Sequence, residues 1–261
     1  ENDLQIDLTN MDNEQREVKS TEIKDYCKNI WYSDCESFVS TSKHSLYLIG
    51  CVSIDSDDVS IFNVCDQKEW KDNSIEQLAV WKWLKTITKD GTQDALCYFH
   101  NLKYDFNLLM QYLNIKGICE KDGAIYNVKL SYKGKEVELR DSFKLLSLGL
   151  AKFNKTFGLG LDKLEAISYE YYTPENNDVI VDKKVYRNAL GSDKDKTTFD
   201  LIMNQDYPDS KEFNPTAYYK VYLEHDCLVL KKGLEAMNKI LLDITDNKLG
   251  AYHKLTISSL T

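Results

Sequence analysis

The sequence lacks several features that mark whole classes of protein. No apolar run reaches the about 18 residues that a membrane-spanning helix needs, which excludes a transmembrane protein. Only three of the 33 basic residues are arginines, so bidentate phosphate clamps are scarce. No signal peptide is present, and the chain opens on Glu1 rather than Met, which indicates that it is part of something longer.

Paired cysteines are also missing. The seven cysteines are scattered, with no CxxC pair and no zinc-finger spacing. An odd and scattered set suits free thiols, most of them in the core, inside a reducing intracellular compartment. The sequence therefore argues against both a disulfide framework and a zinc finger.

The charge balance limits how the chain can meet nucleic acid. Its 42 acidic residues outnumber the 33 basic ones, and the net charge at pH 7 is −9. A protein that grips nucleic acid through a broad basic face has the opposite balance. The chain therefore binds no nucleic acid, or binds it locally while its acids serve another purpose. Holding metal cations is one such purpose.

The hydrophobic pattern predicts an α/β domain. Runs of β-branched and aromatic residues predict strands, and apolar residues at helical spacing after Ser74 predict an amphipathic helix in which Trp81 and Trp83 pack. In order, we expect strands at 29–39, 45–54 and 59–64, a helix at 74–87, a strand at 95–101, a helix at 105–113, a hairpin at 124–143, and helices at 147–159 and 216–244. This order predicts a mixed central sheet flanked by helices.

Composition also suggests domain limits. Residues 1–28 are polar and lack periodicity, and we interpret them as a lead-in or linker. The predicted domain covers residues 29–250. Within it all three prolines fall in a polar stretch, at about 160–215, which predicts a loop-rich insertion.

Four acidic residues lie in or beside the apolar elements, where an unpaired carboxylate is costly. Asp34 and Glu36 are two apart in the first predicted strand and so share one face. Asp105 follows the fourth predicted strand, at the end where α/β sheets place ligands. Asp226 lies on the last helix, and Tyr222 one turn earlier shares its face. Oxygen ligands from separate elements suit Mg²⁺ or Mn²⁺.

Each of these signals is weak by itself. A D-x-E in a strand is more often a solvated strand edge, and a Y-x-x-x-D on a helix is more often a surface pair. Their order along the chain outlines a two-metal phosphodiester hydrolase of ribonuclease H-like architecture.

Three segments resemble the exonuclease motifs of protein-primed family B DNA polymerases. The most specific is CYFHNLKYDFNLLM (97–110), which is similar to the second motif, whose core reads F-H-N-L-K-[FY]-D. YSDCESF (32–38) is similar to the first motif, and YLEHD (222–226) to the third. The resemblance spans about residues 30–244.

Two smaller family motifs are also similar to segments of this chain. RDSFKLL (140–146) resembles the [ST]-L-x-x-h signature, with Phe143 in place of Leu. KLEA (163–166) resembles the K-x-x-h signature.

The resemblance implies a DnaQ-like 3′–5′ exonuclease fold with a site for two divalent cations, Mg²⁺ or Mn²⁺. It implies that Asp34 bridges the two cations. Glu36 and Asp226 are then expected to hold the cation that activates water, and Asp105 to support the other through water.

Further roles follow from the same resemblance. Tyr222 is expected to orient the attacking hydroxide. Lys163 is expected to neutralise the phosphate or to position the tyrosine, unless it is a solvated lysine of a charged loop. The residues expected to hold a frayed single-stranded DNA end are His100, Asn101, Tyr104, Ser142 and Phe143. His100 is equally well explained as a buried histidine with satisfied hydrogen bonds.

No polymerase motif such as S-L-Y-P-S or D-T-D-S is present. The resemblance thus implies a proofreading domain alone, with residues 251–261 starting the connection to an absent polymerase domain. The implied partners are a single-stranded DNA 3′ end, the polymerase domain of the same parent chain and a terminal priming protein, with no membrane, in the cytoplasm, an organelle or a virus factory. Two alternatives stay open: a stand-alone ribonuclease H-like 3′–5′ nuclease, and a catalytically silent exonuclease-like scaffold.

Overall fold

The structure is a computed structural model that describes residues 27–39, 44–66, 74–161 and 166–253. Most of the predicted lead-in lies outside the described residues, as do Lys163 and residues 254–261.

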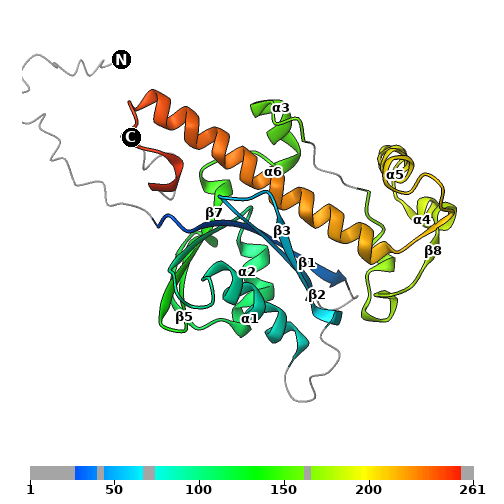
Figure 1. Ribbon diagram of the computed structural model, residues 1–261, viewed down its shortest axis with the longest axis horizontal. Helices are drawn as coiled ribbons and strands as arrows, with labels where there is room; N and C mark the ends of the chain where they lie inside the picture. Colours follow the sequence, from blue (N-terminus) through cyan, green and yellow to red (C-terminus); the bar gives the residue numbers. More distant parts are fainter. Residues whose placement is uncertain (1–26, 40–43, 67–73, 162–165, 254–261) are drawn as a thin grey trace, which may run out of the picture.

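In the described part of the chain, one sheet of seven strands forms the centre of the domain (Figure 1). The strands lie in the order β3 (Val59–Asn63), β2 (His44–Ser53), β1 (Ile30–Val39), β4 (Ala95–Phe99), β7 (Lys135–Asp141), β6 (Ala124–Tyr132) and β5 (Ile115–Lys121). The β1–β4 and β4–β7 pairs are parallel, and the other neighbours are antiparallel. The mixed sheet expected from the hydrophobic pattern is confirmed.

Helices cover both faces of this sheet. The long helix α6 (Pro215–Ile244) crosses one face over β1, β2 and β3, whereas α1 (Ile75–Ile87) and α2 (Lys103–Leu109) pack on the other (Figure 1). An apolar core fills the space on each face. No helix among the described residues combines the length and the apolar character that crossing a membrane demands.

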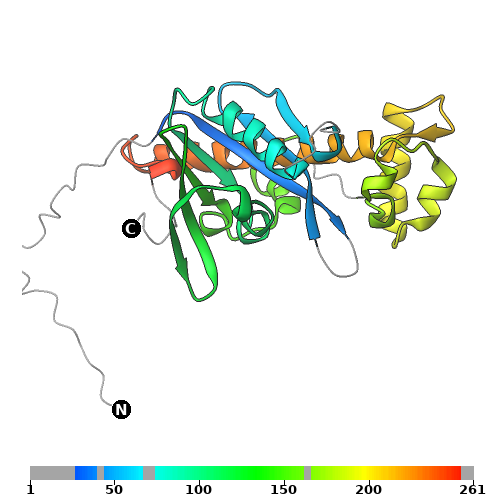
Figure 2. The ribbon, with the colours of Figure 1, turned by 90° about the horizontal axis from the view of Figure 1, so that it is seen from below.

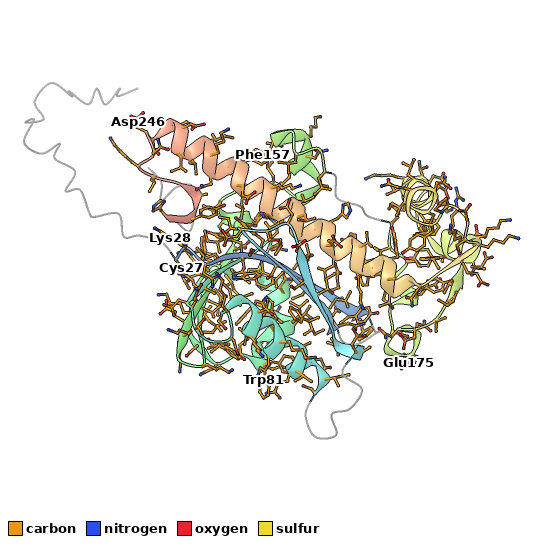
Figure 3. The ribbon with its side chains drawn as sticks, in the orientation of Figure 1. Cys27, Lys28, Trp81, Phe157, Glu175 and Asp246 are labelled. Carbon is orange, nitrogen blue, oxygen red and sulfur yellow. The ribbon has the colours of Figure 1, made fainter. Side chains whose placement is uncertain are left out.

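Helix α1 begins at a capping residue and buries one of its two tryptophans. The Ser74 side chain accepts a hydrogen bond from the Gln77 N–H at the start of α1, as an N-cap does. In α1, Trp83 is fully buried and its indole N–H donates to the Ser33 hydroxyl at 3.1 Å. Trp81 instead lies on the outer side of the helix, 41% exposed (Figure 3). The prediction that both tryptophans pack is therefore wrong for Trp81.

The predicted loop-rich insertion contains more regular structure than its sequence indicates. It includes α4 (Lys183–Ala189), α5 (Asp193–Asp206) and a small sheet of β8 (Val181–Asp182) and β9 (Glu212–Phe213). These elements form a module at the N-terminal end of α6, beyond the edge of the main sheet (Figure 2). Its core gathers around the buried ring of Tyr186. Helix α5 buries Phe199, Ile202 and Met203 at helical spacing, but this pattern is short and polar residues surround it, so the prediction missed the helix.

Three elements of the main domain also differ from the prediction. Strand β5 was not expected, because it is an edge strand whose residues are mostly exposed and show no hydrophobic alternation. The helix expected at 147–159 is reduced to a 3₁₀ turn and α3 (Phe153–Phe157), which ends at Gly158 with φ +65°. The helix expected at 105–113 begins earlier, at Lys103, so Asp105 belongs to its first turn.

Gly50 on β2 is expected to be essential for the close approach of α6 to the sheet. A Cβ at this position would lie 2.8 Å from Cys227 Sγ and 2.9 Å from Leu223 Cγ, both on α6. We predict that Gly50→Ala lowers the free energy of unfolding by about 1–3 kcal/mol, because overpacking forces α6 away from the sheet. Urea denaturation followed by circular dichroism measures the change.

The control for this prediction is Gly117→Ala. Gly117 also lies in a strand, and a Cβ there would meet nothing within 4 Å. Equal stability losses in the two variants would contradict the packing argument.

Candidate functional site

Strand β1 brings two carboxylates to the face of the sheet beneath α6. Side chains alternate along a strand, so Asp34 and Glu36 point to the same side as Tyr32, which packs in the core beneath α6. β1 pairs with β4 only from Ile30 to Tyr32, whereas its pairing with β2 continues past Glu36. The two acids thus lie where β1 and β4 separate, a place where α/β sheets open a crevice for ligands.

Helix α6 places a third carboxylate beside them. Asp226 lies on the buried side of α6, one turn after Tyr222. One carboxylate oxygen from each of Asp34, Glu36 and Asp226 lies within 4.8 Å of the other two. Asp226 is buried and the other two are partly exposed, so the three-carboxylate cluster borders the solvent.

Asp105 reaches the same place from the helix that follows β4. Its side chain is 2% exposed, and one carboxylate oxygen accepts the Cys35 backbone N–H at 2.9 Å. Burial, and after it the charge of Asp34, raises the pKa of Asp105 well above its usual range. Asp105 is not one of the three clustered carboxylates, but it lines the same cavity.

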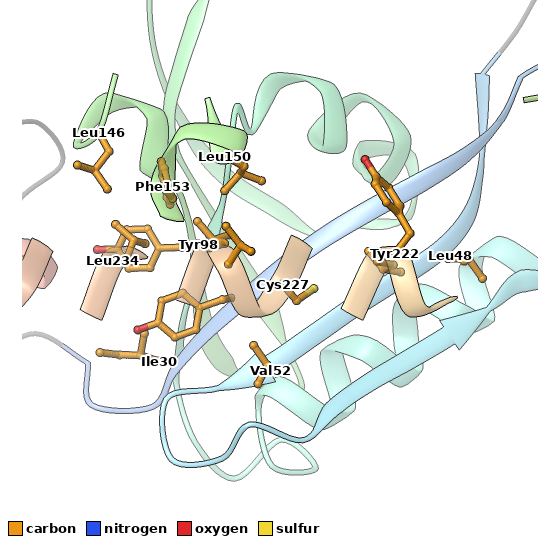
Figure 4. Close-up of a cluster of buried hydrophobic side chains, with 14 of the residues drawn as sticks. Ile30, Leu48, Val52, Tyr98, Leu146, Leu150, Phe153, Tyr222, Cys227 and Leu234 are labelled. Atoms are coloured by element: carbon orange, nitrogen blue, oxygen red, sulfur yellow. The ribbon is translucent and has the colours of Figure 1, made fainter. Parts of the chain in front are cut away.

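A cavity of about 280 Å³ unites these groups. Its lining residues are Asp34, Cys35, Glu36, His100, Asn101, Tyr104, Asp105, Leu150, Tyr222 and Asp226. The ring of Tyr222 rises from α6 at the edge of the apolar cluster, with its hydroxyl at the outer end (Figure 4). The structure therefore brings together all four predicted carboxylates, Tyr222 and three of the five predicted DNA contacts.

The other two predicted DNA contacts do not line the cavity. Ser142 is fully buried, with its hydroxyl oxygen 2.9 Å from His100 Nδ1. The ring of Phe143 meets the His100 ring edge-on, with the centroids 5.5 Å apart. Both residues support His100 instead of lining the cavity.

Asp141 holds the loop that follows β4 and was not singled out from the sequence. One of its oxygens accepts the backbone N–H groups of Asn101 and Phe143, each at 2.9 Å. Asn101 has φ +68°, a left-handed conformation that needs such support in a residue other than glycine. Burial raises the pKa of Asp141. Its place in the R-D-S-F segment was the available signal.

The hydroxyl of Tyr104 contacts residues of β1 and β2. It lies 2.7 Å from the Ser37 hydroxyl and 3.1 Å from His44 Nδ1. These contacts connect α2 to the end of β1 and the start of β2. The sequence did not indicate that Ser37 and His44 belong to the site. The one hint was the position of Ser37 directly after the D-x-E segment.

Tyr219 is a further residue that the sequence did not single out. Its hydroxyl donates a hydrogen bond to Glu36 Oε2 at 2.6 Å. It precedes Tyr222 by three residues on α6, which was the one local signal that the two share a side of the helix. The position of Lys163 falls outside the described residues.

The donor set suits a hard divalent cation. Three carboxylates whose oxygens lie within 4.8 Å repel one another unless positive charge lies between them. Oxygen-only ligands favour Mg²⁺ or Mn²⁺ over zinc. The residues present therefore fit the cations expected from the sequence.

About two thirds of the chain matches a family of DNA polymerases. Residues 87–261 match the family described as DNA polymerase type B, organellar and viral. The matched range contains α2 and α6, and with them Asp105, Tyr222 and Asp226, whereas β1 precedes it. A search of curated proteins found no match.

Solved structures of Phi29 DNA polymerase share the fold. The orthorhombic crystal form aligns with a TM-score of 0.51 and 18% identity over 88% of this chain and 33% of that chain. The complexes with single-stranded DNA and with primer-template DNA and incoming nucleotides have TM-scores of 0.47 and 0.49, at 17% and 16% identity, over 84% of this chain and 35% of theirs. The chain thus spans about a third of the length of these polymerases. The expected ribonuclease H-like fold is confirmed.

Asp105 should destabilise the metal-free protein at neutral pH. A folded-state pKa above the ordinary value means that the native state favours protonated Asp105, so stability is lost as the pH rises through that pKa. We predict that Asp105→Asn, which keeps an oxygen for the Cys35 N–H, unfolds with a free energy about 1–3 kcal/mol higher at pH 8 in EDTA. The gain should shrink towards about pH 4, where the wild-type carboxyl is protonated.

Urea denaturation at several pH values measures this gain. Asp94→Asn is the matched control, because the exposed Asp94 also accepts a backbone N–H, from Glu136 at 2.9 Å. A pH-independent gain, or an equal gain in the control, would contradict the assignment to burial.

Proposed function

Because this chain belongs to the organellar and viral type B DNA polymerases, we propose that it is a proofreading domain that hydrolyses phosphodiester bonds at a DNA 3′ end. The observation that carries the proposal is the convergence of Asp34, Glu36 and Asp226 within 4.8 Å in a cavity that Asp105 and Tyr222 also line. Carboxylates gathered in this way suit metal-assisted hydrolysis of phosphate esters.

The proposed site holds two divalent cations, Mg²⁺ or Mn²⁺, as in a DEDDy-type exonuclease. Such cations lower the pKa of water and stabilise the charge that develops on the phosphate and on the leaving 3′ oxygen. Asp34, Glu36 and Asp226 are the proposed direct ligands. Asp105 supplies a fourth negative charge, and the Cys35 N–H keeps its carboxylate oriented.

Tyr222 is proposed to position the attacking water. Tyr222 lines the same cavity as the carboxylates, one helical turn from Asp226. Its ring stacks on the ring of Tyr219, with the ring centroids 5.7 Å apart. A neutral phenol can accept one hydrogen bond and donate another, so it can orient water without entering the cation site. Lys163 is proposed to assist at the phosphate.

The substrate is proposed to be the frayed single-stranded 3′ end of DNA. Asn101 and Tyr104 offer an amide and an exposed aromatic face in the cavity wall, groups that bind unpaired nucleotides without a broad basic surface. His100, backed by Ser142 and Phe143, completes this wall. A small, local contact of this kind is compatible with the net charge of −9. Most of the affinity for DNA is then proposed to come from other parts of the parent polymerase.

The remaining proposals concern context. We propose that residues 29–250 form the exonuclease domain and that residues 251–261 begin the connection to the polymerase domain of the parent chain. A terminal priming protein is a further proposed partner. All seven cysteines are free thiols, which supports action in a reducing compartment inside a host cell.

The double variant Asp34→Ala with Glu36→Ala tests the proposed activity. We predict that it abolishes Mg²⁺- or Mn²⁺-dependent 3′–5′ degradation of single-stranded DNA, because it removes two of the three clustered ligands. The fold should persist, since removing like charges relieves repulsion in the metal-free protein. Denaturing gels of a 5′-labelled oligonucleotide measure degradation, and circular dichroism checks folding.

A charge-matched control is Glu224→Ala with Asp243→Ala, two exposed acids of α6 outside the cavity. It should degrade DNA at the wild-type rate. Full activity in the Asp34 and Glu36 variant would refute the proposed site, and an inactive wild-type protein would favour the silent scaffold.

Tyr222→Phe separates the role of the hydroxyl from that of the carboxylates. We predict that Mn²⁺ binding is unchanged, whereas the single-turnover rate constant falls by about 10–1000-fold, as for a lost positioning contact. Rapid-quench cleavage of a short 3′ single strand at saturating Mg²⁺ measures the rate. An unchanged rate constant would mean that Tyr222 is a packing residue.

A further inference from the structure

Tyr219 lies directly behind the three-carboxylate cluster. It is on α6, its side chain is only 1% exposed, and it does not line the cavity. Its hydroxyl reaches β1, where it donates to Glu36 Oε2 at 2.6 Å. This contact joins the two elements that supply the clustered carboxylates.

The hydrogen bond has a fixed direction. The Tyr219 hydroxyl carries a proton and an ionised carboxylate can only accept, so the hydroxyl donates to Glu36. Hydrogen bonds from a neutral donor to an ionised carboxylate are short and strong. A carboxylate has two oxygens, so a hydrogen bond to one of them is compatible with Glu36 serving as a cation ligand.

The ring that carries this hydroxyl is held by other aromatic side chains. Tyr172 packs against it with centroids 3.9 Å apart, and Tyr47 and Tyr222 lie 6.0 Å and 5.7 Å away. The Tyr172 hydroxyl is in turn 2.7 Å from that of Tyr186, in the core of the α4–α5 module. The hydroxyl of Tyr219 is therefore presented to Glu36 from a rigid support.

We infer that Tyr219 is a positioning residue for Glu36, which it holds in the orientation that joins Asp34 and Asp226 at the cation site. This inference rests on the proposed function, since it assumes that the cluster binds divalent cations. Partners that orient metal ligands typically contribute 10–100-fold to metal affinity or activity. Without the hydroxyl, Glu36 must lose side-chain freedom each time a cation binds.

The test compares Tyr219→Phe with Tyr218→Phe in the full 261-residue chain. Both variants keep their rings and lose a buried hydroxyl from α6. The control residue Tyr218 is equally buried, but its hydroxyl donates to the Ala166 carbonyl oxygen at 3.3 Å, away from the cavity. Differences between the two variants therefore report on Glu36 and not on the loss of a buried hydroxyl in general.

Direct Mn²⁺ binding is the first measurement, by isothermal titration calorimetry. We expect Tyr219→Phe to weaken Mn²⁺ binding about 10-fold and Tyr218→Phe to leave it unchanged. In the nuclease assay, the Mg²⁺ concentration for half-maximal rate should rise by a similar factor in Tyr219→Phe, while the rate at saturating Mg²⁺ returns close to that of wild type. If Tyr219 had a structural role alone, its loss would lower the rate at all Mg²⁺ concentrations, including saturating ones. It would not shift the metal dependence while leaving the saturated rate unchanged.

A double-variant comparison tests the path of the effect. In a Glu36→Ala background, Tyr219→Phe should weaken Mn²⁺ binding no further, because the side chain that it positions is gone. If Tyr219→Phe weakened Mn²⁺ binding by the same factor in the double variant as it does alone, the inference would be overturned. Tyr219→Met, a second replacement without a hydroxyl, must reproduce the shift if Tyr219→Phe folds poorly.

The outcomes separate this inference from the proposed function. Equal Mn²⁺ affinity in Tyr219→Phe, Tyr218→Phe and wild type, with an active wild-type nuclease, would overturn the role of Tyr219 and leave the proposed function intact. A wild-type protein that neither binds Mn²⁺ nor degrades DNA would refute the proposed function and this inference with it.

Discussion

The close packing of α6 against β1 and β2 is the constraint on which the site depends. Gly50 has no side chain, so Leu223 and Cys227 can lie directly over β2. In the β1–β2 pairing, Gly50 stands opposite Asp34. The turns of α6 that meet Gly50 also carry Tyr222 and Asp226, and this single approach therefore sets their distance from the strand acids.

This packing brings like charges together at a cost that the scaffold must offset. Asp105 is buried against the β1 backbone with its pKa raised, and Asp226 is buried beside two further acids. Unbalanced carboxylates in such a setting oppose folding, because burial and mutual repulsion both disfavour their charged forms. Fixed donors, the Cys35 N–H and the Tyr219 hydroxyl, partly compensate. A protein that had no use for cations would gain stability by losing these acids.

The relation to known polymerases is carried by different parts of the chain. The family match begins at residue 87 and includes the helices that bear Asp105 and Asp226. Asp34 and Glu36 precede that range, and their inclusion in the site rests on geometry, since their oxygens meet that of Asp226. At 18% identity, the likeness to Phi29 DNA polymerase reflects a shared fold more than shared side chains. The α4–α5 module adds a separate aromatic core at one end of α6.

Much of the fold and of the site could be read from local sequence. The alternation in β1 put Asp34 and Glu36 on one face, and the helical period put Tyr222 and Asp226 on one side of α6, because both periods are properties of neighbouring residues. The element order and the mixed sheet followed from the same patterns. The edge strand β5 was missed because its mostly exposed residues show no alternation, and the α4–α5 module was missed because its helical pattern is short and lies in a polar segment that contains all three prolines.

Only the tertiary structure decided which side chains meet across the sheet. Tyr219 and Glu36 are 183 residues apart, and Asp141 and Asn101 are 40 apart, yet each pair is joined by a hydrogen bond. The tertiary structure likewise placed Ser142 and Phe143 in contact with His100, outside the residues that line the cavity. Local patterns determine which face a residue occupies, whereas the partner on that face depends on how distant elements pack.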